Sequence, residues 1–550
     1  MADYLKMVEQ REAELNALFA RMDKEKDLYY LKAFTLKDND GREIPNVNNL
    51  TLNDPAVFAK RAIAILAGAE MQTVVEGEGL TDKQTTFIEG FLDGLDFAVN
   101  AQLAELRGWA SAFAFYCEQI ALRGRVSARC LLRMDGKKFV PDILPLDGRY
   151  LIHEVGADGL NWVAYKTSRT KAKILAEYDI QINSATAVVT DFWDEEFNRI
   201  FISSQQAREQ KNTFGYLPFV IQISGGGSML QDEDALEHEG EGVLSLNCDL
   251  YPELNRLATI LHTLNELSFN AGMQYESGAG EQAKKPTLPP YGKRFVLPVE
   301  KGGGFKPMPI NDIRDSTRLL YSMLEGRIQR GSLPAVDYGN LTFPLSAVAI
   351  SRLTEGRDQI FLPRIQALAM FKQQLGKMAI RQYVDGKMKV ELGQGGYTQQ
   401  YPYQQLKGDY TVKYRFFTTS AEQKIADLAV ARSAQGFLSD DTIRRDILKL
   451  PNPDGEYQKR RAELAERVDP AIALYRHACS LIEEEEYIEA RLVAEQLMAM
   501  LKQRKMAGPT APTEGPGQEG IPGVGRELIP LLTAGGGGAR RQPKAEEEIE

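Results

Sequence analysis

Two helix patterns of similar length, separated by a long segment without a helical period, restrict the fold more than any other feature of the sequence. The first pattern begins at Pro252, carries leucines in register and ends near Gly272, and the second runs from Asn311 to near Gly331. The residues between them are rich in glycine and proline and hold one strand-like run, 294–298. A helix of about 20 residues spans roughly 30 Å. The sequence therefore predicts a long helical hairpin with a small module at its tip.

An irregular loop and a very long helix follow the hairpin. The loop covers residues 332–345 and mixes apolar with polar side chains. Ser346 then provides an N-cap for a long helix that reaches about Val384. Pro363 lies in the interior of this helix, where it removes a backbone N–H and clashes with the preceding turn. We therefore expect a kink at this residue.

The chain before residue 240 divides into a helical part and a strand-rich part. We expect helix over the first thirty residues, a helix from Asp54 with Pro55 in its first turn to about Met71, and another helix that opens at the Thr81–Gln84 capping box. From Arg125 onward, short apolar segments alternate with Asp-Gly pairs. This alternation is typical of strands joined by hairpins.

The last part of the chain is almost entirely helical in pattern. The helical pattern runs from Ser420 to about Met506. Residues 507–550 are rich in glycine and proline and end in acidic residues, and we interpret them as a flexible tail. Taken together, these patterns predict an α+β fold that is predominantly helical.

The charge balance limits how this protein meets nucleic acid. Its 76 Asp and Glu outnumber its 66 Lys and Arg, giving a net charge of −10, which argues against a protein that wraps nucleic acid with a basic surface. The segment between the hairpin helices runs against this trend, with six basic and three acidic residues. The basic residues are Lys284, Lys285, Lys293, Arg294, Lys301 and Lys306. They form either an ordinary solvated surface or a docking site or phosphate-facing wall.

No catalytic motif emerges from the sequence. Each Gly-Lys pair is followed by Lys, Arg or Met, so no GxxxxGK[ST] phosphate-binding loop is present. The four histidines have neither zincin spacing nor a neighbouring cysteine pair. Acidic residues such as Asp232, Asp234 and Glu237 are able to hold magnesium, although a solvated loop is the favoured interpretation. We expect no enzymatic activity, no cofactor and no metal.

The cysteines and the chain's apolar segments indicate the compartment. The cysteines are Cys117, Cys130, Cys248 and Cys479, which lie far apart and suit free thiols in a reducing compartment. The first residues are charged, and no window reaches about 18 apolar residues. We therefore expect neither a signal peptide nor a membrane span.

The order of these segments resembles the portal proteins of tailed double-stranded-DNA bacteriophages. The resemblance rests on the run Lys306-Pro-Met-Pro-Ile-Asn311, the helix 314–330, the loop 332–345 and the run Ser346-Ala-Val-Ala-Ile350 that opens the long helix. The run from Ser420 to Glu456 is similar to the start of a portal crown. The likeness covers about residues 50–505 and depends on element order and loose motifs.

The resemblance implies a set of domains. These are the N-terminal part of a wing (1–240), stem helix 1 (241–272), a clip (273–310), stem helix 2 (311–331), a tunnel loop (332–345), a long kinked wing helix with wing strands (346–419), a helical crown (420–506) and the tail (507–550).

The resemblance also implies a function. Portals form rings of twelve subunits at one capsid vertex and provide the channel for genome packaging and ejection. Their clip binds the terminase large subunit and later the head-tail adaptor, and their wing contacts the major capsid and scaffolding proteins. The chain would then reside in the virion after assembly in the host cytoplasm, with no membrane contact. Twelve chains of net charge −10 carry −120, so double-stranded DNA would slide through without sequence-specific binding.

Particular residues take roles under this resemblance. The clip would use Lys284, Lys285, Lys293, Arg294 and Lys301; the stem would present Arg327 and Arg330 to the channel; the tunnel loop would place Val336, Asp337, Tyr338 and Asn340 at its tip; and Pro363 would kink the wing helix.

Two other classes remain open from the sequence alone. One is a carboxylate-based, metal-dependent nuclease or other hydrolase in which the helical hairpin is a regulatory arm. The other is a different ring-forming virion connector, although such adaptors are usually much shorter than 550 residues.

Overall fold

The computed structural model describes most of the chain and divides it into two compact units, Met1–Lys459 and Arg460–Glu550. The described residues are 2–136, 138–225, 233–269, 273–276, 304–307, 315–333, 347–394, 397–417, 421–450, 453–483 and 486–506. They combine helices and strands, which confirms the predicted α+β class.

The N-terminal part of the first unit is helical, as predicted. Its helices are α1 (Ala2–Glu14), α2 (Asn16–Tyr29), α3 (Asp54–Ala67), α4 (Asp82–Arg107) and α5 (Ala112–Leu122). The helix expected over the first thirty residues is confirmed, and the chain forms it as two helices that meet at Leu15. The capping box at Thr81 is confirmed: the Thr81 N–H donates to Gln84 Oε1 at 3.0 Å.

A strand that the sequence pattern hid follows α3. The prediction that the helix extends to Met71 is wrong, because β1 (Glu70–Glu76) begins one residue earlier and pairs antiparallel with β14 (Thr411–Phe417). Met71 lies opposite Phe416. Residues 72–75 are all buried, so β1 lacks the alternation of a half-exposed strand. Its partner lies far away along the chain, and local patterns do not reveal such a pairing.

Two antiparallel sheets form the strand-rich part. The three-stranded sheet has the order β3-β2-β9, and the five-stranded sheet runs in chain order from β4 to β8. The strands are β2 (Arg125–Asp135), β3 (Lys138–Leu146), β4 (Leu151–Gly156), β5 (Gly159–Thr170), β6 (Thr186–Trp193), β7 (Phe197–Ile202), β8 (Gln205–Lys211) and β9 (Phe219–Ile223). Helix α6 (Lys171–Tyr178) joins β5 to β6. The hairpins predicted at the Asp-Gly pairs 135–136 and 158–159 are confirmed. The hairpin predicted at the pair 147–148 is wrong, because the flanking strands β3 and β4 belong to different sheets.

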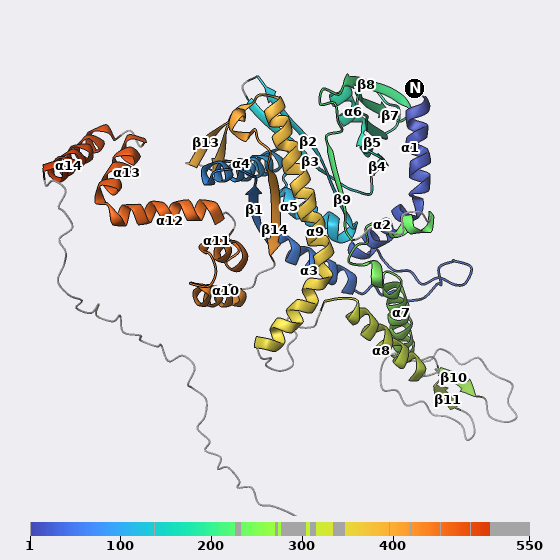
Figure 1. The fold of residues 1–550 in the computed structure, drawn as a ribbon. Helices are drawn as coiled ribbons and strands as arrows, with labels where there is room; N and C mark the ends of the chain where they lie inside the picture. The colour runs from blue at the N-terminus through green and yellow to red at the C-terminus, as the bar shows by residue number, and fades with distance from the viewer. Residues whose placement is uncertain are drawn as a thin grey trace, which may run out of the picture. The chain divides into compact units, whose positions relative to one another are not determined.

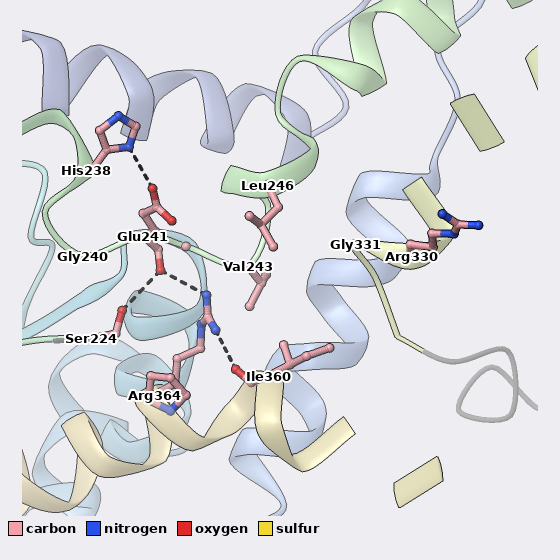
Figure 2. A pocket seen from close by; sticks show the side chains of 13 residues that line it. Ser224, His238, Gly240, Glu241, Val243, Leu246, Arg330, Gly331, Ile360 and Arg364 are labelled. Carbon is pink, nitrogen blue, oxygen red and sulfur yellow. Dashed lines mark hydrogen bonds and ion pairs between the residues drawn. The ribbon is translucent and has the colours of Figure 1, made fainter. Parts of the chain in front are cut away.

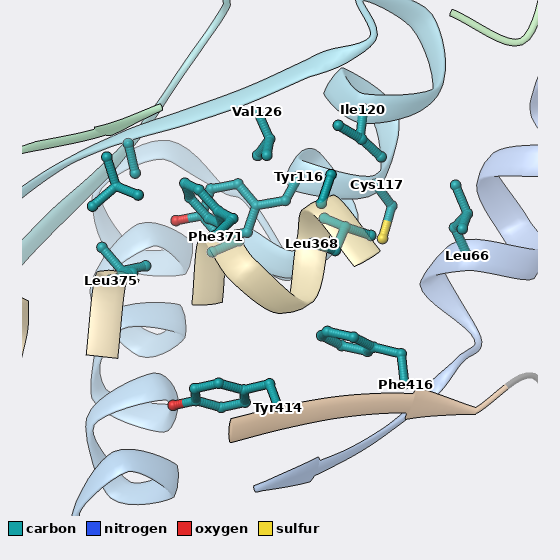
Figure 3. Close-up of a cluster of buried hydrophobic side chains, with 14 of the residues drawn as sticks. Leu66, Tyr116, Cys117, Ile120, Val126, Leu368, Phe371, Leu375, Tyr414 and Phe416 are labelled. Atoms are coloured by element: carbon teal, nitrogen blue, oxygen red, sulfur yellow. The ribbon is translucent and has the colours of Figure 1, made fainter. Parts of the chain in front are cut away.

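The main core lies where the long helix α9 (Ala347–Asp385) crosses the helices and strands of the first unit (Figure 3). Tyr116 of α5 packs edge-on against Phe371 of α9, with ring centroids 4.7 Å apart. A second cluster holds α1 and α2 against the five-stranded sheet, through residues such as Leu18 and Trp162. Burial of these apolar side chains stabilises the arrangement, and Figure 1 shows α1 beside the five-stranded sheet.

The remaining elements of the first unit follow α9. Strands β12 (Lys389–Gln394) and β13 (Tyr397–Pro402) form an antiparallel pair. Helices α10 (Ala421–Ala434) and α11 (Asp440–Thr442) come after β14, and α11 leads into one turn of π-helix, Ile443–Ile447. Helix α12 (Pro453–Val468) runs across the boundary between the two units.

The second unit contains two packed helices. They are α13 (Pro470–Glu483) and α14 (Tyr487–Met506). Small and apolar residues, among them Ala478 and Ala490, are buried between them. The predicted tail, residues 507–550, lies outside the described residues.

Candidate functional site

The predicted helical hairpin is present. Helices α7 (Leu250–Phe269) and α8 (Asp315–Arg330) pack against each other. The short strands β10 (Met273–Glu276) and β11 (Gly304–Pro307) pair antiparallel beyond the end of α7, as Figure 1 shows. At the other end, Asn247 Nδ2 donates to the Ile328 carbonyl at 3.2 Å. The two helices are therefore tied together at their base.

One face of α7 binds the backbone of an extended segment, residues 48–52. The bonds are Asn48 N–H to Thr263 Oγ1 (3.2 Å), Leu50 N–H to Thr259 Oγ1 (3.0 Å) and Leu52 N–H to Asn255 Oδ1 (2.9 Å). Alternate residues of an extended chain are about 6.6 Å apart, and every fourth residue of a helix is about 6 Å apart. The two spacings match closely enough for three bonds in a row. We call this arrangement the α7 ladder.

Helix α8 has one buried and one exposed face. Ile328 is buried, and Tyr321 and Leu324 pack against the main core. On the other side Leu319 and Met323 are 61% and 53% exposed. With Gly326 and Arg330 they repeat at intervals of four, three and four residues, which places them on one stripe of the helix.

This outer stripe of α8, namely Leu319, Met323, Gly326 and Arg330, has room for a neighbour. Apart from its two chain neighbours and the backbone of its own helix, no described atom lies within 4 Å of where a Cβ at Gly326 would stand. Heptad-like spacing of apolar residues is the pattern by which one helix packs on another. Among the described residues, the outer stripe is the part of the hairpin that offers an unpartnered apolar face.

The two predicted channel arginines lie in the last turn of α8. Arg327 and Arg330 are both exposed. Cations in the last turn of a helix interact favourably with its dipole. Arg330 also belongs to the outer stripe. Whether either arginine faces a channel stays a prediction.

Most of the other predicted site residues lie outside the described residues. These are Lys284, Lys285, Lys293, Arg294 and Lys301 of the predicted clip, and Val336, Asp337, Tyr338 and Asn340 of the predicted tunnel loop. The strand-like run 294–298 lies outside them too. Pro363 lies inside α9 as predicted, and Figure 1 shows the ribbon of α9 changing direction along its length. That Pro363 causes this bend stays a prediction.

A cavity of about 460 Å³ lies where the base of the hairpin meets α9 (Figure 2). Its lining includes Val243, Leu246, Ile360, Pro363, Arg330 and Arg364. Leu246 is 76% exposed. The lining is mainly apolar and carries two arginines, but Figure 2 shows the Arg330 side chain directed away from the other lining residues.

The chain that leads into α7, residues 237–248, is held by side chains from distant elements, and we call it the strap. Arg21 of α2 donates to the carbonyls of Glu237, Glu239 and Gly240, the last at 2.7 Å. The strap passes so close to α5 that a Cβ at Gly242 would stand 2.6 Å from the Leu122 carbonyl oxygen. The sequence pattern does not predict these hydrogen bonds to the strap, because the acceptors are backbone atoms.

Beneath the strap lies a buried carboxyl group. Ser245 Oγ donates to Glu25 Oε1 at 2.6 Å. Burial raises the pKa of Glu25 above its ordinary value, although the hydrogen bond from Ser245 and the charge of Arg21 act in the opposite direction. A buried carboxylate is costly unless it is paired, so Glu25 ties the strap to α2 at some cost in stability.

The hydrolase alternative would need side chains that converge on a metal ion, and the structure addresses this for the described residues. Within them no group of three His, Cys, Asp or Glu side chains converges to hold a metal ion. Glu237 is exposed, whereas Asp232 and the side chain of Asp234 lie outside the described part. His153 is buried in β4, and burial lowers its pKa to about 3. It is therefore neutral in the folded protein at ordinary pH.

The four cysteines are free thiols, as predicted. Cys117, Cys130 and Cys248 are buried, and Cys479 is half-buried. Burial raises the pKa of the Cys248 thiol to about 11. A high pKa keeps such a thiol protonated and unreactive. Within the described part of the chain, no helix combines the length and the apolar character that crossing a bilayer requires.

Comparison with known proteins returns structural likenesses alone. No family model matches the chain, and no curated protein matches it. Similar solved structures include a chain of the neck of an empty gene transfer agent particle, with a TM-score of 0.40 and 15% identity over 72% of this chain and 90% of that chain. A chain from the virion of a native gene transfer agent particle has a TM-score of 0.37 and 14% identity over the same shares. At this level the likeness assigns neither fold nor function to this chain.

Proposed function

We propose that this chain is the subunit of a portal ring of a tailed phage or phage-like particle. Twelve copies would surround a channel through which double-stranded DNA enters and leaves the capsid. The observation that carries the proposal is the outer stripe of α8, an exposed apolar helix face on a hairpin whose place in the element order matches the stem of portal proteins.

The outer stripe supports assembly because apolar residues at heptad-like spacing along one helix face are the pattern by which helices pack on one another. Leu319 and Met323 would be covered by a helix of a second copy, and the missing Cβ at Gly326 would let the two helices approach closely. Each copy presents the same stripe, so the contact would repeat around a closed ring.

The charge of the chain supports passage of DNA over tight binding. A net charge of −10 in each copy repels phosphates. Arg327 and Arg330 would add sparse positive rings that contact phosphates without reading sequence. In this proposal the protein does no chemistry, and a separate motor supplies the energy for packaging.

The partners follow from the parts of the subunit. The basic segment between the hairpin helices would bind the terminase large subunit during packaging and the head-tail adaptor afterwards. The part with the sheets would contact the major capsid and scaffolding proteins. The protein would be assembled in the host cytoplasm and reside in the virion.

The first test is the mass and shape of the purified protein. A ring of twelve copies has twelve times the 61.4 kDa mass of the chain. Mass photometry measures this mass, and negative-stain imaging would show a ring with a central hole. A monomer or dimer that persists across salt and protein concentration would contradict the proposal. Metal-dependent hydrolysis would then be the activity to assay.

A second test addresses the clip. We predict that Lys293→Glu with Arg294→Glu leaves rings intact but impairs packaging, because the change replaces two cations of the proposed motor-docking surface by two anions. An in vitro DNA-packaging assay measures the effect, with Lys173→Glu and Lys377→Glu as a charge-matched control away from the hairpin. Packaging at the control's level by the Lys293/Arg294 variant would exclude this docking surface.

A further inference from the structure

The position of Arg364 suggests a role beyond holding the core together. Arg364 follows directly after Pro363 in α9. Its Nη1 donates to the Ile360 carbonyl at 2.8 Å, and its Nη2 donates to the Glu241 carbonyl at 3.1 Å. One guanidinium thus spans the α9 turn that contains Pro363 and the strap, as Figure 2 shows.

The two carbonyls that accept from Arg364 belong to different segments, α9 and the strap. Ile360 lies in the turn of α9 where Pro363 supplies no N–H to the helix. Glu241 lies in the middle of the strap, and its carbonyl also accepts from Ser224 Oγ at 3.3 Å. The strap leads into α7, and its Asn247 bonds to the end of α8. A shift of the strap therefore reaches both helices of the hairpin.

Arg364 is not free to leave these acceptors at low cost. It is largely buried, and burial lowers its pKa, against the favourable charges of Glu25 and Glu241. A buried guanidinium that loses an acceptor bears the full cost of its desolvation. When Ile360 moves, Arg364 therefore moves with it or loses a hydrogen bond. In either case the hydrogen bond from Arg364 to the Glu241 carbonyl is altered.

The cavity beside Arg364 provides the space for such a movement. Close-packed interiors resist displacement of their side chains. Here about 460 Å³ is open between Val243 and Leu246 of the strap and Ile360 of α9. Arg21 of α2 also holds the strap, and its hydrogen bonds among the described residues go to the strap and not to α9.

We propose that Arg364 is a positioning residue that couples the α9 turn around Pro363 to the position of the strap, so that the two segments change together. This inference goes beyond the proposed function and does not depend on it. It concerns the way one helix of the subunit is connected to the base of the hairpin.

Amide hydrogen exchange of the full chain tests the coupling. Pro363→Ala restores the missing N–H and changes the local bend, and we expect it to speed exchange of the Val243 and Asn247 amides by about threefold or more. In an Arg364→Met background these amides exchange faster from the start, and Pro363→Ala then adds nothing further.

Arg21→Met is the matched control. It removes an arginine that holds the same strap but does not reach α9, so the strap should loosen and still respond to Pro363→Ala. Arg364→Lys is a second variant that keeps the charge with a single donor group, and we expect it to retain part of the response. Circular dichroism of each variant checks that the fold is intact.

Two outcomes would overturn the coupling. One is a strap that exchanges at the wild-type rate in Pro363→Ala. The other is an equal response to Pro363→Ala with and without Arg364. Both leave the ring proposal untouched, because neither readout depends on assembly.

Discussion

The two helices of the hairpin have similar lengths and opposite roles. On α7, the side chains of Asn255, Thr259 and Thr263 bind the extended segment 48–52 of the same chain. Helix α8 buries one face and leaves Leu319 and Met323 exposed on the other. The difference indicates that α7 anchors the hairpin to the rest of the chain, whereas α8 carries apolar side chains that no described residue covers.

The largest effect should come from the outer stripe of α8. We predict that Leu319→Glu with Met323→Glu converts rings to monomers, because it places charges where a second copy would bury apolar surface. Mass photometry measures the change. His262→Glu, at an exposed position of α7, is the control and should leave rings intact. Loss of rings in the α7 control, or intact rings in the α8 variant, would break the distinction between the helices.

A smaller effect should come from the α7 ladder. Thr259→Val with Asn255→Leu removes two acceptors while nearly keeping side-chain volume, and it leaves the Leu50 and Leu52 N–H groups without their acceptors. We expect a loss of about 2 kcal/mol in the free energy of unfolding and faster amide exchange at Leu50 and Leu52. Denaturant titration and hydrogen exchange measure the two effects.

Ser322→Ala on α8 is the matched control for the ladder. The Ser322 hydroxyl donates only to the carbonyl of Leu319 in its own helix. Its removal should cost little in stability. An equal loss in this control would show that hydroxyl groups on α7 and α8 are equivalent, contrary to the comparison.

An effect of similar size should appear only in acid, and it should spare the hairpin. His153 in β4 has a pKa lowered by burial to about 3, whereas an unfolded histidine has an ordinary value of 6.5. Below pH 6.5 the unfolded chain therefore binds a proton that the folded chain does not, and stability falls as the pH falls toward 3. We expect a loss of about 2 kcal/mol at pH 5, from about 1.4 kcal/mol for each pH unit.

His153→Gln isolates this contribution. The variant should show about 2 kcal/mol less loss of stability than the wild type between pH 7 and pH 5. Ser322→Ala on α8 changes no titratable group and should follow the wild-type curve. Identical pH profiles for the wild type and His153→Gln would refute the assignment of acid sensitivity to the five-stranded sheet.

Local sequence patterns correctly predicted the helices and hairpins that interactions between neighbouring residues determine. The Thr81 capping box fixes the start of α4, and the Asp-Gly pairs 135–136 and 158–159 fix two hairpins. The long hairpin and the position of Pro363 inside α9 also follow from helical period and length.

Long-range contacts account for what the patterns missed. Strand β1 is extended because it pairs with β14, which lies far away along the chain, and four buried residues in a row gave it no alternation. The sequence does not predict the hydrogen bonds of the α7 ladder and of the strap. One partner in each bond is a backbone atom, which carries no residue-specific signal. The sequence thus predicted the two helices of the candidate site. It did not predict the hydrogen bonds that hold them to the rest of the chain.

The matched spacings of the α7 ladder also restrict how α7 can travel along its own axis. The three bonds form at one register, so a slip by a single residue of segment 48–52 would turn every N–H away from the helix. On the reverse side of the same segment, Asn49 and Thr51 accept from the N–H groups of Leu36 and Phe34. Helix α7 therefore cannot slide along its axis independently. It keeps its position, or residues 34–52 move together with it.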